Sequence, residues 1–99
     1  MDFEVIRKKT IEVKIVDDNA VVLIETDNNG QFINAKAFDL EAYNSEQYVP
    51  IDFSMKVDKL EKEFIPHGTL TVSHSSPYCI RYVDGYRNLI KICSPGAVC

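Results

Sequence analysis

The strongest constraint on the fold lies between Gly68 and Cys93, where turn-forming residues divide the chain into short runs of strand-forming residues. Pro, Gly, Asp and Ser favour tight turns, whereas β-branched and aromatic residues favour strands. The separators are Ser75-Ser76-Pro77 and Asp84-Gly85. The pattern predicts three consecutive antiparallel strands: Thr69–Ser73, Tyr78–Val83 and Asn88–Cys93.

The register of the last predicted hairpin follows from burial rather than from the shortest turn. A two-residue turn at Asp84-Gly85 would mix apolar and charged side chains on both faces of the hairpin. Burying one isoleucine contributes ~1.5–3 kcal/mol, whereas an ideal turn residue contributes up to ~1 kcal/mol. We therefore expect a longer loop over Val83–Arg87, with these pairs across the strands: Ile80 with Ile90, Tyr78 with Ile92, and Tyr82 with Asn88.

The first half of the chain predicts further strands. Ala20–Thr26 is a continuous apolar run, which is typical of a central strand covered on both faces. Asp27-Asn28-Asn29-Gly30 predicts a hairpin turn after it, because Asn-Gly readily adopts the positive φ that tight hairpins require. Three other segments alternate with a period of two, each with one apolar face: Thr10–Val16 (Ile11, Val13, Ile15), Gln31–Phe38 (Ile33, Ala35, Ala37) and a strand from Val49 to Lys56, with Val57 continuing its face (Val49, Ile51, Phe53, Met55).

One or two short helices are expected between these strands, one from Asp58 and an optional one after Asp39. Asp39 is a helix N-cap residue followed by good helix formers up to Glu46. A second helix is predicted over 58–64, where Asp58 and Glu61 resemble a capping box. The predicted fold class is therefore mainly β, with six or seven antiparallel strands as a sandwich or strongly curled sheet. One domain over residues 1–99 is expected, with 94–99 as a flexible tail.

Composition narrows the function classes. The formal net charge is −4, and high affinity for nucleic acid or anionic membrane comes mainly from Lys and Arg, so both partners are disfavoured. The chain has no apolar run of about 18 residues and no signal-peptide pattern at its start, which predicts a cytoplasmic protein. The excess of Lys over Arg, with many Ile and Asn, hints at a bacterial or phage source.

The three cysteines, Cys79, Cys93 and Cys99, match no zinc or redox spacing. In a cytoplasm all three are expected to be reduced thiols. The alternative is a loop closed between Cys93 and Cys99 in an oxidising compartment.

The sequence contains no recognisable catalytic motif. His74 lies among serines, but neighbours in sequence seldom form a catalytic triad, and His67 has no partner pattern. The turn at Asp27–Gly30 lacks the spacing and the final glutamate of a calcium loop. We therefore expect neither an enzyme nor a cofactor or metal site.

The segment with most functional content is Tyr78–Arg87, because Tyr and Arg are enriched at binding hot spots and a hairpin presents them rigidly. A purely structural explanation competes with this one, since tyrosines prefer strands and Arg81 can lie over the sheet. Stacking of a nucleobase on the tyrosines is a second possibility. The candidate binding residues are Tyr78, Arg81, Tyr82, Tyr86 and Arg87.

The sequence thus predicts a small acidic protein-binding module, monomeric or homodimeric, such as an inhibitor, immunity or accessory protein that occupies a partner's surface. The alternative is a structural subunit of a homo-oligomer or particle. A nucleotide-binding or other small-ligand protein, or an enzyme, ranks third.

Overall fold

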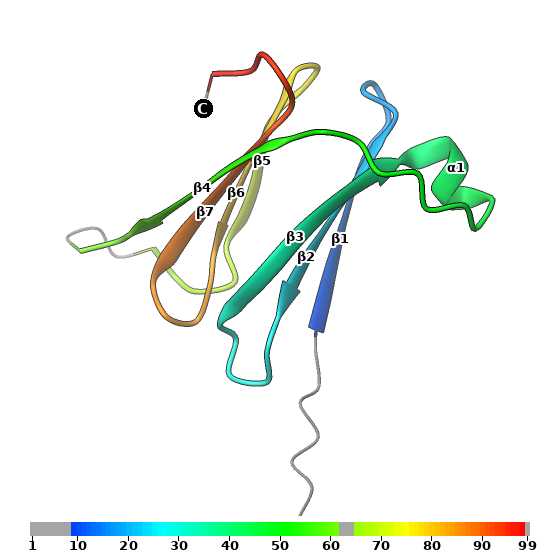
Figure 1. The fold of residues 1–99 in the computed structure, drawn as a ribbon. Coiled ribbons are helices and arrows are strands. Elements are labelled where there is room, and N and C mark those ends of the chain that lie inside the picture. Colours follow the sequence, from blue (N-terminus) through cyan, green and yellow to red (C-terminus); the bar gives the residue numbers. More distant parts are fainter. Residues whose placement is uncertain (1–8, 62–64, 99) are drawn as a thin grey trace, which may run out of the picture.

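The computed structural model describes residues 9–61 and 65–98, which form seven strands in two antiparallel sheets and one short helix (Figure 1). This confirms the predicted mainly β fold. The side chains of His74 and Ser75 are not described. The elements are β1 (Lys9–Ile15), β2 (Ala20–Thr26), β3 (Phe32–Asp39), α1 (Leu40–Asn44), β4 (Ser54–Lys59), β5 (Leu70–Ser75), β6 (Tyr78–Val83) and β7 (Asn88–Cys93).

The three-stranded sheet has the order β1-β2-β3, so the continuous apolar run does form a central strand, as predicted. Val21 and Val22 point to opposite faces of β2 and are both fully buried. On the outer face, α1 contacts β2 and β3. The predicted N-cap is confirmed, because the side chain of Asp39 accepts a hydrogen bond from the Ala42 N–H at 2.9 Å.

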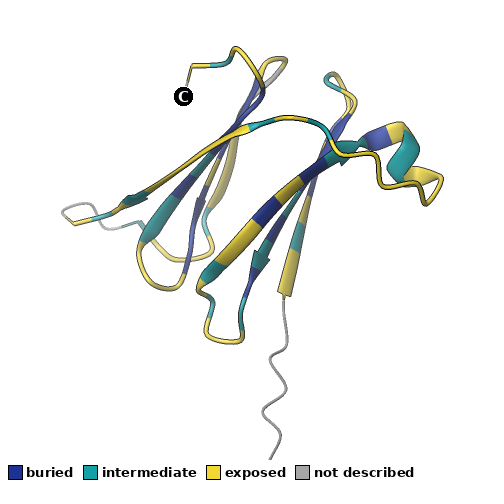
Figure 2. Ribbon diagram, in the orientation of Figure 1, coloured by how far each residue is buried: buried dark blue, intermediate teal, exposed yellow. Residues whose placement is uncertain are grey.

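The four-stranded sheet has the order β4-β7-β6-β5, which places the predicted hairpin β6–β7 at its centre. Its inner face packs against the three-stranded sheet through one shared core cluster (Figure 2). The fully buried members of that cluster come from both sheets: Ala20, Val22, Ile24, Ile80, Ile90 and Ile92.

The register of β6 and β7 differs from the prediction by two residues. Ile80 faces Ile92, and Tyr82 faces Ile90. A shift of two leaves the same side chains on the inner face, so the predicted apolar face is correct and the predicted pairs are wrong. The reason is the loop: Asp84 N–H donates to Asn88 O at 3.1 Å and ends the pairing beyond Val83.

Ile33 was predicted to share a buried face with Ala35 and Ala37, but its side chain is 43% exposed. The register of β2 and β3 shifts between Glu25 and Thr26. This irregularity turns Ile33 outward, and Phe32 packs against the core instead.

The second predicted helix is wrong where the structure describes it. Asp58 and Lys59 belong to β4 and pair with Leu89 and Asn88, while residues 62–64 lie outside the described part of the chain. Pairing with β7 overrides the local helical pattern, as tertiary context commonly does. The predicted strand beginning at Val49 likewise starts later, at Ser54, because the preceding residues cross from one sheet to the other.

The C-terminal residues lie against β6. Ser94 N–H donates to Tyr78 O at 3.1 Å, and Val98 O lies 3.7 Å from the Cys79 sulfur. Cys79 faces Cys93 across β6 and β7, with 3.8 Å between the sulfurs. Neither Cys79 nor Cys93 is a free thiol in the structure, so the expectation of reduced thiols is wrong for these two residues. Cys99 lies outside the described part of the chain.

Candidate functional site

The structure separates the five predicted binding residues into core and surface positions. Tyr78 and Tyr82 are 1% and 6% exposed and belong to the core cluster. Burial raises the pKa of both phenols, with a smaller contribution from Asp18 for Tyr78 and from Asp84 for Tyr82. Tyr78 and Tyr82 therefore belong to the core and are not accessible to a binding partner.

Tyr86 and Arg87 lie at the tip of the β6–β7 hairpin, where the last residue of β4 and the residue after it hold them. Leu60 N–H donates to Arg87 O at 2.9 Å, and Lys59 Nζ donates to Tyr86 O. The Tyr86 side chain remains 43% exposed. The tip thus presents an aromatic side chain from a constrained backbone, as the sequence predicted.

Asp84 organises this tip. One carboxylate oxygen accepts the N–H groups of Tyr86 and Asn88, and the other accepts Phe32 N–H and the Asn88 amide. Burial alone would raise the pKa of Asp84, but these four donors together hold it below its ordinary value. The charged carboxylate therefore fixes the hairpin tip against the other sheet.

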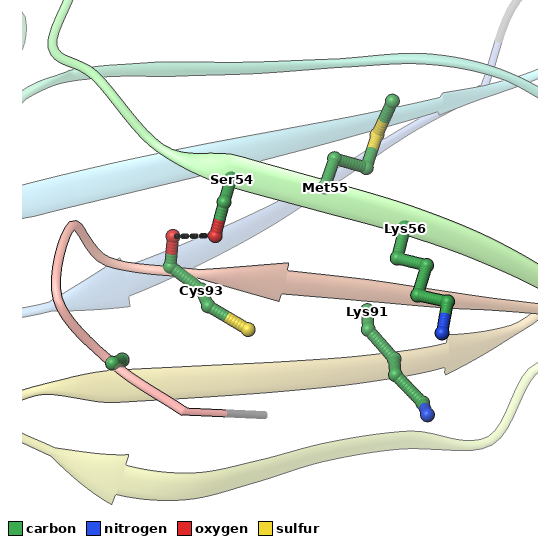
Figure 3. Close-up of a pocket in the computed structure, with 6 residues that line it drawn as sticks. Ser54, Met55, Lys56, Lys91 and Cys93 are labelled. Carbon is green, nitrogen blue, oxygen red and sulfur yellow. Dashed lines mark hydrogen bonds between the residues drawn. The ribbon is translucent and has the colours of Figure 1, made fainter.

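Arg81 lies on the outer face of the four-stranded sheet, in register with two lysines. It faces Lys91 on β7, and Lys91 faces Lys56 on β4. We call Lys56, Lys91 and Arg81 the cationic row. Lys56 and Lys91 extend the same way from neighbouring strands (Figure 3).

One carboxylate partly neutralises the cationic row. Asp58 lies 3.8 Å from Lys56 Nζ and 3.4 Å from Lys91 Nζ. Three positive charges and one negative charge leave a local excess of two, on a chain whose formal net charge is −4. The outer face of this sheet is therefore positively charged on an acidic protein.

Two shallow hollows flank the cationic row. One, of about 160 Å³, lies where the C-terminal residues approach β4 and β7 (Figure 3). The other, of about 260 Å³, is more apolar and includes Arg81. Their linings are Ser54, Met55, Lys56, Lys91, Cys93 and Ala97 for the first, and Ile65, Thr69, Thr71, Ser73, Arg81, Val83 and Leu89 for the second.

Sequence reasoning identified Arg81 and missed Lys56 and Lys91. The parity of the hairpin pairs already placed Arg81 and Lys91 on one face, which was the available signal. Lys56 joins them through the pairing of β4 with β7. That pairing was hidden because the chain after Lys56 was expected to be helical.

Other parts of the molecule hold a further hollow and an aromatic cluster. A hollow of about 580 Å³ at one end of the sheets includes Asp18 and Asp52. Phe38, Tyr43 and Tyr48 form an aromatic cluster with ring centroids 5.6–6.3 Å apart. Among the side chains that the structure describes in residues 9–61 and 65–98, which exclude His74, no three His, Cys, Asp or Glu are grouped to hold a metal ion. The same residues contain no helix long and apolar enough to span a membrane.

Comparison with known proteins found no matching family model, curated protein or solved structure. The candidate site therefore rests on the geometry and charge of the outer face of the four-stranded sheet.

Proposed function

We propose that this chain is a small protein-binding module that docks through the outer face of its four-stranded sheet. The observation that carries the proposal is the cationic row, in which three positive side chains face one another across adjacent strands. Tyr86 and Arg87 are exposed at the tip of the β6–β7 hairpin, which also carries Arg81 and Lys91. Tyr and Arg are residue types common at binding hot spots.

The cationic row is unfavourable for the isolated sheet. Like charges directly opposite each other in a sheet are destabilising, by up to about 1 kcal/mol for each pair. Asp58 offsets part of this cost through its two ion pairs. A partner carboxylate placed over the cationic row would attract the three cations and so offset their mutual repulsion. The row therefore favours a partner with an acidic surface.

Within this proposal, an inhibitor, immunity or accessory role suits the chain, because such proteins act by occupying a surface. A bacterial or phage origin remains part of the proposal, whereas the bonded state of Cys79 and Cys93 favours an oxidising compartment over the predicted cytoplasm. The expected free state is a monomer or homodimer.

Paired affinity capture from a lysate of the native host tests the proposed function. The double variant Arg81→Glu/Lys91→Glu reverses two charges of the row. The control Lys14→Glu/Lys36→Glu reverses two half-exposed lysines on the other sheet, both of them also ion-paired. We expect quantitative mass spectrometry to find a protein that wild type and control retain and that the double variant loses. If every captured protein is retained equally by all three baits, the outer face is not the binding surface.

A second candidate function is a structural subunit of a homo-oligomer. The inner-face side chains of both edge strands of the four-stranded sheet are partly uncovered. Their exposed fractions are 45% for Met55, 47% for Val57, 38% for Leu70 and 42% for Val72. Light scattering after gel filtration tests this alternative: a closed ring or polymer that Val57→Lys dissociates would favour it over a stand-alone binder.

A further inference from the structure

We propose that the occupant of the outer face is an extended acidic segment of a partner protein, with carboxylates two residues apart and an apolar residue two positions further along. This inference rests on the proposed function and names the chemistry of its partner. The segment would cross the strands along the cationic row, from β4 towards β5.

The charge of the outer face selects an anionic ligand. Lys56 is 73% exposed and so is available to a ligand, whereas Lys91 is 22% exposed and is fixed by Asp58. Ser54 lines the same hollow, but its hydroxyl donates to Cys93 O at 3.4 Å, so the two lysines are the cationic donors there. One ligand carboxylate between Lys56 and Lys91 would receive charge-assisted hydrogen bonds, which are stronger than neutral ones.

The spacing of the strands sets the spacing within the ligand. Neighbouring strands lie about 4.8 Å apart, so the midpoint between Lys56 and Lys91 is about 7 Å from Arg81. Side chains two residues apart on an extended chain point the same way and lie about 6.6 Å apart. A second carboxylate two residues after the first would therefore reach Arg81.

The second hollow accounts for the apolar residue. Four residues of extended chain span about 13 Å, which reaches from the midpoint of Lys56 and Lys91 to the β5 edge. The hollow at that edge contains the apolar side chains of Ile65, Val83 and Leu89. An aliphatic side chain placed there would act as a buried anchor, the kind of contact that dominates binding energy at interfaces.

The same face is a poor fit for nucleic acid. Single-stranded nucleic acid binds on aromatic platforms, where each base stacks on a ring. The outer-face positions of the described strands β4, β6 and β7 carry Ser, Lys, Asp, Cys, Arg, Val and Leu, and the corresponding position of β5 is Thr71. Cations without rings favour carboxylates of a peptide over stacked bases.

A labelled synthetic peptide tests the inference directly. The probe is a fluorescein-labelled peptide of sequence Glu-Thr-Glu-Thr-Leu, and the readout is fluorescence anisotropy at low salt. We expect saturable binding that weakens with added salt, because the contacts are ionic. Lys91→Gln is expected to weaken binding about tenfold, as befits a lost hydrogen bond to a charged group. The matched control Lys36→Gln removes an ion-paired lysine from the other sheet and should bind like wild type.

Two further peptides separate the parts of the inference. Replacing both Glu residues of the probe with Lys should abolish binding, and replacing its Leu with Ser should weaken it. Equal binding of the Leu and Ser peptides would overturn the role of the second hollow. Absence of saturable binding, or an equal loss with Lys36→Gln, would overturn the inference itself.

Peptide binding and affinity capture together separate failure of the acidic-segment inference from failure of the proposed function. If the peptide does not bind while affinity capture finds a partner that the Arg81→Glu/Lys91→Glu variant loses, the acidic-segment inference fails and the protein-binding function stands. If a labelled single-stranded oligonucleotide binds more tightly than the peptide and needs Lys91, the ligand is a phosphate chain, and both proposals fail.

Discussion

The carboxylate of Asp84 accepts a hydrogen bond from the backbone N–H of Phe32, 52 residues away, at 2.9 Å. This bond joins the β6–β7 hairpin to the first residue of β3 on the other sheet. Beside it, Gly85 N–H donates to Gly30 O at 2.8 Å. The β2–β3 turn and the β6–β7 turn therefore pack against each other.

Asp84→Asn should lower the free energy of unfolding by about 2–4 kcal/mol, because an amide NH₂ would face two of the N–H donors that the carboxylate now accepts. Urea denaturation measures the change. The control is Asp27→Asn: Asp27 accepts N–H bonds from Asn29 and Gln31 within its own exposed turn. The control should cost less than about 1 kcal/mol. Equal losses of stability in the two variants would show that the hydrogen bonds of Asp84 contribute no more than those within the exposed turn at Asp27.

The pH dependence of stability should carry the signature of Asp84. Its folded pKa is lowered by hydrogen bonds, so its stabilisation is fully present above the unfolded pKa of about 3.9 and is lost as the pH falls through the lower folded value. Urea midpoints of wild type and Asp84→Asn should therefore differ most above about pH 4 and converge in more acidic solution. A difference that stays constant down to pH 2 would contradict this assignment.

Gly85→Ala should destabilise the protein by about 1–3 kcal/mol, because a Cβ there would lie 3.0 Å from the backbone oxygen of Asn29. The contact is with backbone, which cannot rotate away. Gly96→Ala is the comparison, since its Cβ would meet open space and would carry only the strain of φ +83°. Thermal unfolding of the two variants should rank Gly85→Ala as the more damaging, and the reverse order would mean that the docked turns can separate cheaply.

Tyr78→Phe should leave stability unchanged or raise it by up to about 1 kcal/mol. The Tyr78 hydroxyl is buried and has no hydrogen-bond partner within the described residues. Removing it therefore removes the free-energy cost of burying an unsatisfied polar group. Tyr43→Phe is the control, because that hydroxyl donates to Glu12 Oε2 at 2.8 Å and its loss should be mildly destabilising. A clear loss of stability in Tyr78→Phe would indicate a bound water or other partner at the hydroxyl.

Arg81→Thr should separate stability from binding. It removes a cation that faces Lys91 and supplies a good strand former, so the free energy of unfolding should rise by up to about 1 kcal/mol. Partner or peptide binding should weaken in the same variant. Chemical denaturation and anisotropy on one preparation measure both quantities. A variant that is less stable and binds normally would assign Arg81 to the scaffold.

Local sequence pattern was sufficient for the strands whose signals lie within a few residues. The bounds of β6 and β7 follow from alternation between clear turn residues, and β2 follows from an unbroken apolar run. The inward face of the hairpin follows from the same pattern, because a strand repeats every two residues whatever its register.

Only the tertiary structure decided how those segments meet. The register of β6 and β7 depends on Asp84, whose partners include Phe32 on the other sheet. Asp58 and Lys59 carry a helical pattern, yet they lie in β4 because pairing with β7 supplies backbone hydrogen bonds, whereas an isolated short helix is only marginally stable. The cationic row combines residues from three strands, and the core brought Tyr78 and Tyr82 inside. Contacts between distant segments depend on the packing of the whole chain, which no local window of the sequence contains.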